Sequence, residues 1–214
     1  MYVKYRMTAN PYTISPNAPI TEVIELMREK KLKRVPVVDG DRLVGIVTDS
    51  DIQGISPTKK TTLSIYELNY LLSKIKVKDA MTKEVITIPP DALLEEAAVL
   101  MRENKVSSLA VVEKNKLVGI ITESDIFDAF IDLLGFKETG SRITIEAEDV
   151  PGVLADITEK FKSFGLNITH IAVFRGKSGR SDIVIRTNAI NTDELEKKIE
   201  EAGYKIYHKI KKVE

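Results

Sequence analysis

Apolar positions along the first part of the chain change their spacing in a regular order. Residues 19–31 place apolar side chains three or four positions apart, which predicts a helix. The runs 35–38 and 43–47 are continuous and rich in β-branched residues, which predicts two strands. Asp39-Gly40 stands between the runs, and this dipeptide between apolar segments is typical of a β-hairpin.

The same order then occurs a second time. Moving residues 7–52 forward by 74 positions places them on 81–126 without a gap, and 22 of the 46 pairs are identical when counted along the sequence. The second copy predicts a helix over 92–104, strands over 109–112 and 117–121, and a helix from about 124 to 134 that ends at Gly135. Two copies are too few for a solenoid, so we expect a paired unit with an internal pseudo-two-fold axis and a cleft between the halves.

The last third of the chain has a different order of predicted strands and helices, which indicates a separate small domain. Its predicted elements are strands at 142–147, 168–175, 181–187 and 204–211, and helices at 153–164 and 192–202. This βαββαβ order predicts a four-stranded antiparallel sheet with both helices on one face, so the fold class is α+β. We therefore predict a first repeat at 1–76, which includes a loop at 53–62 and a helix at 63–75. A second repeat follows at 77–135, a linker at 136–140, and the small domain at 141–214.

Composition narrows the function classes. Hydrophobic residues make up 43 % of the chain, and 32 Lys and Arg balance 32 Asp and Glu. Binding to nucleic acid normally needs a basic excess, so this balance argues against it. The chain has no cysteine, which excludes disulfides and thiolate metal sites, and neither a signal peptide nor a membrane span is evident. We expect a cytoplasmic protein.

Each copy closes on a motif suited to phosphate. Gly45 and Gly119 each open a strand that leads into a helix start with small hydroxyls and a carboxylate, ending at Asp51 and Asp125. A helix start offers free backbone N–H groups to phosphate oxygens, and an aspartate can accept from the two hydroxyls of a ribose. The alternative is that Thr-x-x-Asp is a capping box that stabilises the helix without a ligand.

The paired motifs fit the pattern G-h-x-[ST]-x-x-[DN], and the repeats resemble a tandem of cystathionine β-synthase (CBS) domains, also known as a Bateman module. The resemblance implies an adenine nucleotide or S-adenosylmethionine bound between the repeats, and usually a homodimer. The nucleotide-binding residues that it implies are Thr13, Ile14, Arg34, Thr48, Ser50, Asp51, Thr87, Ile88, Thr122, Ser124 and Asp125. Lys33-Arg34 in the first copy corresponds to Ser107-Ser108 in the second, so we expect unequal sites, the first better suited to phosphates.

The stretch Asp149-Val150-Pro151-Gly152-Val153-Leu154 resembles the D-x-P-G-h-L motif of ACT domains. That resemblance implies an amino-acid effector site, formed by Asp149, Gly152, Val153, Leu154 and Asn167. The alternative is that Asp149 only caps the following helix. The arrangement as a whole looks like the bacterial acetoin-utilisation accessory proteins, which does not by itself establish a role in acetoin metabolism.

The sequence offers no catalytic constellation and no metal site. His170 and His208 lack partners at metal-ligand spacing, and no P-loop or nucleophile elbow is present. We therefore predict a non-catalytic regulatory protein without a cofactor, which senses an adenine nucleotide, forms a homodimer and acts on a partner protein or enzyme. The alternatives are a ligand-free scaffold for dimerisation or interaction and, with less support, a nucleic-acid-binding protein.

Overall fold

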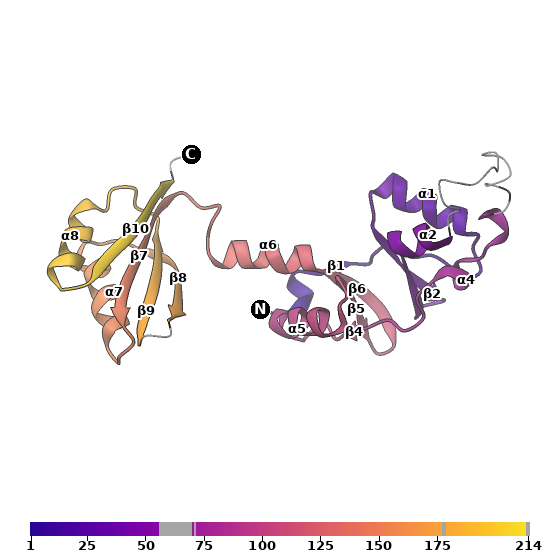
Figure 1. Cartoon of the computed structure of the whole chain (residues 1–214), viewed down its shortest axis with the longest axis horizontal. Helices are drawn as coiled ribbons and strands as arrows, with labels where there is room; N and C mark the ends of the chain where they lie inside the picture. Colours follow the sequence, from indigo (N-terminus) through magenta and orange to yellow (C-terminus); the bar gives the residue numbers. More distant parts are fainter. Residues whose placement is uncertain (56–69, 71, 177–178, 213–214) are drawn as a thin grey trace. The chain divides into compact units, whose positions relative to one another are not determined.

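The structure is a computed structural model that describes residues 1–55, 70, 72–176 and 179–212 (Figure 1). The chain divides into two compact units, Met1–Phe127 and Asp128–Glu214.

The first unit contains both repeats. The first repeat has η1 (Val3–Tyr5), β1 (Thr8–Ala9), α1 (Ile20–Lys30), β2 (Arg34–Asp39), β3 (Arg42–Thr48) and α2 (Asp49–Ile55). The second has α4 (Val77–Ala80), β4 (Thr87–Ile88), α5 (Leu94–Asn104), β5 (Ser108–Glu113), β6 (Lys116–Thr122) and α6 (Glu123–Leu133), which continues into the second unit.

The strand pairing repeats with the sequence. In the second repeat β4 pairs in parallel with β5 at Ile88 and Val111, and in the first repeat an isolated parallel bridge joins the equivalent residues Ile14 and Val37. Both hairpins, β2–β3 and β5–β6, have a two-residue turn and the same register shift opposite the motif glycine. The predicted pseudo-two-fold symmetry is therefore confirmed at the level of individual residue pairs between strands.

The two repeats exchange their leading segments. Strand β1 pairs antiparallel with β6, so that Thr8 lies opposite Ile120 of the other repeat. The equivalent Thr82 bridges Ile46 in β3, again across the repeats. The segment at the start of each repeat therefore completes the sheet of the other repeat.

This exchange explains the glycine of each motif. A Cβ on Gly119 would lie 3.2 Å from the carbonyl oxygen of Thr8 and would collide with the side chain of Met7. A Cβ on Gly45 would meet the equivalent atoms of Met81 and Thr82. Glycine is needed at these two positions because a foreign backbone crosses the strand there.

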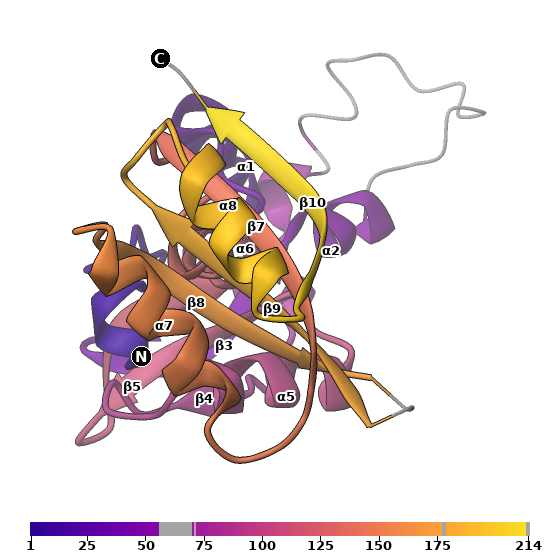
Figure 2. The same cartoon turned by 90° about the vertical axis from the view of Figure 1, so that its left-hand side faces the viewer.

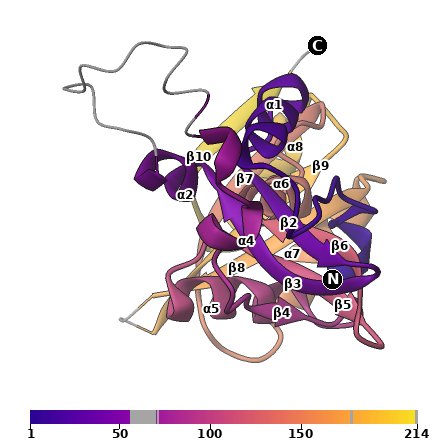
Figure 3. The same cartoon turned by 90° about the vertical axis from the view of Figure 1, so that its right-hand side faces the viewer.

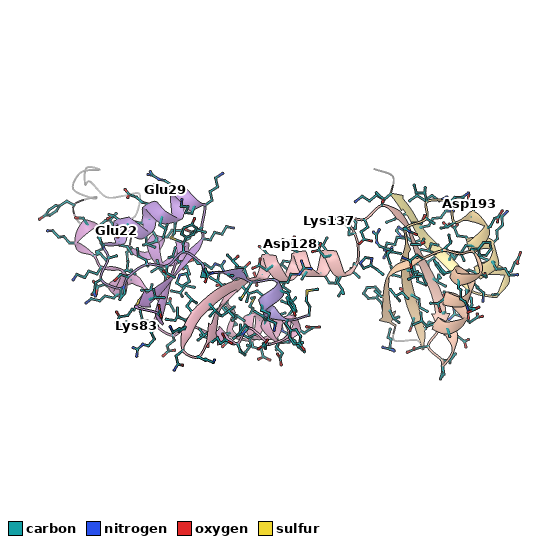
Figure 4. All side chains as sticks on the ribbon, turned by 180° about the vertical axis from the view of Figure 1, so that it is seen from behind. Glu22, Glu29, Lys83, Asp128, Lys137 and Asp193 are labelled. Carbon is teal, nitrogen blue, oxygen red and sulfur yellow. The ribbon has the colours of Figure 1, made fainter. Side chains whose placement is uncertain are left out.

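Helix α1 covers the hairpin of the first repeat with one apolar face (Figure 3). Val23 and Met27 lie in the core, whereas Glu22 and Glu29 are exposed on the other side of the helix (Figure 4). This is the amphipathic pattern that the sequence predicts. The core also includes Ile20, Val35, Val37, Val47, Leu72 and Val77.

The second unit is a four-stranded antiparallel sheet with both helices on one face (Figure 2). Its elements are β7 (Gly140–Glu148), α7 (Val153–Ser163), β8 (Ile168–Arg175), β9 (Arg180–Thr187), α8 (Asp193–Glu201) and β10 (Lys205–Lys212), and the strand order is β10-β7-β9-β8. The core lies between sheet and helices and is built around Ile143, Ile145, Phe161, Ile185 and Ile199. The predicted βαββαβ fold is confirmed.

Some predicted elements fall outside the described residues. Residues 53–55 belong to α2, but the rest of the predicted loop 53–62 lies outside them. Of the predicted helix 63–75, residues 70 and 72–75 are described, and all of them are helical except Ile75, where the prediction is wrong. The sequence also predicts a turn at 177–179 between two strands, and of these residues only Gly179 is described.

Candidate nucleotide site

Two cavities lie between the repeats, of about 840 Å³ and 430 Å³. Their linings are related by the 74-residue shift of the repeat. Thr122, Glu123 and Ser124 line the larger cavity, and Thr48, Asp49 and Ser50 line the smaller one. The pairs Thr8/Thr82, Asn10/Glu84, Pro11/Val85, Tyr12/Ile86, Lys31/Lys105, Leu32/Val106 and Ile120/Ile46 follow the same rule. The two cavities are therefore equivalent sites of one pseudo-symmetric unit.

The motif aspartates close a cap at the helix start. In the second repeat the backbone N–H and the hydroxyl of Thr122 both donate to Asp125 Oδ2, at 2.7 and 2.8 Å. Thr48 and Asp51 make the same two bonds at 2.8 and 2.7 Å in the first repeat. The capping interpretation is therefore confirmed in both copies, and it leaves the Oδ1 atom of each aspartate available for another donor.

In the first repeat that second oxygen already has a donor. The hydroxyl of Thr82, on the exchanged segment, lies 3.3 Å from Asp51 Oδ1. Among the described residues, Asp125 Oδ1 makes no corresponding bond with the equivalent Thr8. The two sites thus differ in whether Oδ1 of the motif aspartate already accepts a hydrogen bond.

Arg34 lies where the two cavities meet. Its Nη1 donates to the carbonyl oxygen of Ser107 at 2.6 Å, and the side chain lines both cavities. Burial lowers the pKa of the Arg34 guanidinium, and nearby carboxylates act in the opposite direction. These carboxylates are Glu123, Asp49 and Asp125.

The expectation that the first motif has the better phosphate site stays a prediction, and Lys33 and Arg34 do not distinguish the two motifs. It placed Lys33 and Arg34 with the motif of their own repeat, whereas in the structure both residues line both cavities. The cavity at the second motif also has Lys31 and Asn10, while the one at the first motif has Lys105 and the acidic Glu84. The balance of charge favours phosphate in the larger cavity.

Asp51 and Asp125 follow lining residues but line neither cavity themselves, and the remaining predicted residues lie elsewhere. Thr13 and Ile14 line neither of the two cavities, Thr87 lines a third hollow, and Ile88 is 3 % exposed beside an apolar groove. Residues 8–12 and 82–86 line the two cavities instead. The sequence contained a signal for them, because Met-Thr begins both copies, at Met7 and Met81.

The D-x-P-G-h-L loop of the second unit is ordered around an ion pair. Asp149 Oδ2 accepts from Arg175 Nε at 2.9 Å, and Gly152, with φ of 95°, is the N-cap residue of α7. No side chain caps that helix, so the alternative role of Asp149 as its cap is wrong. Val153 packs on the core, Leu154 is 40 % exposed, and Asn167 is exposed.

The described residues form neither a metal cluster nor a membrane-spanning helix. Among the described residues, no three His, Asp or Glu side chains lie close enough together to hold a metal ion. Within the same residues, no helix has the length and apolar character to cross a membrane.

Comparison with known proteins agrees with this geometry. Residues 3–56 and 77–132 match the CBS domain. The chain belongs to the CBS-domain family. Residues 141–203 match the ACT domain, so a CBS pair precedes a C-terminal ACT domain.

Solved structures of CBS pairs resemble the first unit. A structure of the acetoin utilization protein AcuB from Vibrio cholerae has 30 % identity and a TM-score of 0.53, covering 64 % of this chain and 95 % of that one. The CBS-pair protein CBSX2 from Arabidopsis thaliana, solved in complex with AMP, has 32 % identity and a TM-score of 0.51, covering 61 % of this chain and 96 % of that one.

The curated relatives include enzymes. An inosine-5'-monophosphate dehydrogenase from Methanocaldococcus jannaschii is 39 % identical over 116 residues, which are 53 % of this chain and 20 % of that protein. The similarity to these dehydrogenases is confined to the CBS region. This chain spans between 20 % and 34 % of the length of the first curated relatives that it matches.

Proposed function

We propose that this protein is a non-catalytic regulator that senses an adenine nucleotide, with AMP the first candidate, in the clefts of its CBS pair. The observation that supports it best is the larger cavity, of about 840 Å³, where the Thr122–Ser124 motif faces a cationic segment of the other repeat. The AMP complex of CBSX2 shows that a similar CBS pair accommodates this nucleotide.

The phosphate would lie at the start of α6. The hydroxyl of Ser124 would donate to it there, and the helix dipole favours an anion, whereas the hydroxyl and backbone N–H of Thr122 already donate to Asp125. Lys31, Lys33 and Arg34 line the same cavity and would supply the opposing positive charge.

The sugar and base would occupy the rest of that cavity. Asp125 Oδ1 is the natural acceptor for a ribose hydroxyl, because Oδ2 already accepts from Thr122. Tyr12 lines the cavity and is 53 % exposed, so its ring is available to stack on adenine, with Pro36 and Ile120 also in the lining.

The regulatory output would be a change in population between two arrangements of the protein. A nucleotide that contacts both repeats stabilises one arrangement by its difference in affinity for the two. We also propose a homodimer whose changed surface acts on a partner protein or enzyme, and an amino-acid effector at Asp149 and Asn167 of the ACT domain.

Calorimetric titration with AMP, ADP, ATP and S-adenosylmethionine tests the nucleotide proposal. Asp125→Ala should weaken AMP binding at least ten-fold, and Asp51→Ala should have a smaller effect. The matched control is Glu96→Ala, which removes a cap at Leu93, where the backbone N–H donates to Glu96 Oε2 at 2.8 Å, outside both cavities. AMP binding should survive in this control.

The scaffold alternative makes the opposite prediction. If none of the four compounds binds the wild type, while the oligomeric state is the same in wild type and in the double aspartate variant, the motif is a capping device alone. A second titration with single amino acids on Asp149→Ala tests the ACT proposal independently, since Asp149 belongs to the other unit.

A further inference from the structure

The open face of the ACT sheet, opposite its helices, places two arginines and a histidine side by side. The register pairs Arg186 of β9 with Arg142 of β7 on one side and with His170 of β8 on the other. Residues directly opposite on neighbouring strands share a face, with Cβ atoms roughly 5 Å apart. Three adjacent strands therefore present Arg142, Arg186 and His170 in one row.

Arg186 is buried with one nitrogen unpaired. The residue is 5 % exposed, and its Nε has no hydrogen-bond partner among the residues that the structure describes. Within the described part of the chain, neither Arg186 nor Arg142 has a carboxylate at ion-pair distance. Burial and the like charge of Arg142 both lower the pKa of Arg186, with burial the larger cause, and the carboxylate of Glu138 acts in the opposite direction.

Arg142 turns toward the neighbouring side chains of the same face. Its Nη1 lies 3.0 Å from Thr144 Oγ1 and 3.2 Å from His208 Nδ1. A guanidinium can only donate, so His208 Nδ1 accepts in this contact. His208 therefore extends the row toward the edge strand β10 as a neutral imidazole.

A segment of chain covers one side of the row. The Phe136 ring lies 6.0 Å from the Arg186 guanidinium, and Lys212 Nζ contacts the carbonyl oxygens of Phe136 and Lys137 at 3.3 and 2.8 Å. Glu138 of this segment brings its Oε2 to 3.5 Å from His170 Nδ1. Its side chain is 50 % exposed, so a ligand could displace it.

We propose that Arg142, Arg186 and His170 form a binding site for a small oxyanion, through a carboxylate or phosphate group. Like charges opposite one another on a sheet destabilise it, and a buried polar group without a partner costs stability. An oxyanion relieves both penalties, because its oxygens accept from two guanidinium groups at once and neutralise their charge.

This site is distinct from the D-x-P-G-h-L loop. Arg142 lies near the start of β7, whereas Asp149 follows its end at Glu148. Six residues of strand separate positions 142 and 148, which is about 20 Å. The row also lies on the sheet face without helices, whereas the loop leads into α7 on the other face.

The two histidines make the proposal testable at the site itself. The sequence has only His170 and His208, and both border the row. Their imidazole proton signals, assigned with His170→Gln and His208→Gln, should shift and saturate when inorganic phosphate replaces chloride at constant pH and ionic strength. The nucleotide cavities contain no histidine, so phosphate bound there does not report in these signals.

Arg186→Met should raise the phosphate concentration that half-saturates the shift of the His170 signal at least ten-fold. The control is Arg180→Met on the same strand, which removes an equal charge from an exposed pair with Glu146 and should leave the response unchanged. Arg142→Gln provides a second variant if Arg186→Met does not fold. A parallel titration with succinate separates a carboxylate site from a phosphate site. The proposal is overturned if neither anion saturates the wild-type signals, or if the Arg180 and Arg186 variants respond alike.

Discussion

Arg34 of the first repeat donates a hydrogen bond to the backbone carbonyl of Ser107 in the second repeat, at 2.6 Å. The contact joins the repeats at a point that lines both cavities. The residue equivalent to Arg34 in the second repeat is Ser108, so this guanidinium has no symmetric counterpart. One side chain thus supplies positive charge to two sites.

Arg34→Met should therefore weaken nucleotide binding at both cavities. We expect a loss of at least ten-fold at each site, about 1.4 kcal/mol, because a charge-assisted bond to phosphate is lost. Calorimetric titration with AMP measures it, and Arg28→Met on the exposed side of α1 is the control. A loss at one cavity alone would contradict the shared position of Arg34.

Gly119→Ala should destabilise the first unit by about 1–3 kcal/mol, because the new methyl group meets the exchanged segment at Met7 and Thr8. The double variant with Met7→Ala should recover part of this loss, since the backbone oxygen of Thr8 remains in place. Urea unfolding measures both changes. No recovery in the double variant would indicate that Met7 is not the obstacle.

Gly54→Ala should have the opposite effect and increase the stability of the first unit. Gly54 lies in α2, and a Cβ there meets nothing within 4 Å. Alanine in a helix is more stable than glycine by roughly 0.5–1 kcal/mol. We expect this variant to raise the urea midpoint, and a decrease would show that the position is more constrained than the structure indicates.

Asp125→Asn should separate capping from ligand binding. Asparagine keeps an oxygen that accepts from Thr122, so the free energy of unfolding should change little, whereas Asp125→Ala should cost about 1 kcal/mol. Thermal unfolding without ligand gives the capping effect. Equal destabilisation by both substitutions would mean that the charge rather than the acceptor stabilises the helix start.

Tyr204 makes the ACT domain sensitive to alkaline pH. Its hydroxyl donates to Asp156 Oδ2 at 2.7 Å, and burial together with this bond raises its pKa from 10.0 to about 12. A raised folded-state pKa gives a stabilisation that is complete below pH 10 and is lost as the pH rises toward 12. Urea midpoints across this range should fall less steeply in Tyr204→Phe. Parallel curves for wild type and variant would contradict the prediction.

Much of the fold could be predicted from local patterns. Helices α1 and α5, both hairpins and the βαββαβ order follow from spacing and turn residues such as Asp39-Gly40. The repeat itself predicted the pseudo-two-fold, and the structure reproduces it down to the bridges at Ile14 and Ile88. These features depend on residues close together in the sequence.

The site could be predicted only in part, because its parts are brought together by long-range pairing. The Thr-x-x-Asp motifs lie where the pattern placed them, but Thr8 and Thr82 reach the opposite repeat, which spacing alone does not reveal. The same crossing places Lys33 and Arg34 against both motifs. The row on the ACT sheet was missed for a similar reason, since Arg142, His170 and Arg186 meet only through strand register.

The exchange of leading segments has a consequence for how the two halves depend on each other. Neither half is complete alone, because β1 serves the second repeat and the segment at Thr82 serves the first. The CBS pair is thus arranged as two like subunits of a symmetric dimer would be, joined in one polypeptide. This arrangement allows the two copies to differ at single positions, as Arg34 and its equivalent Ser108 illustrate.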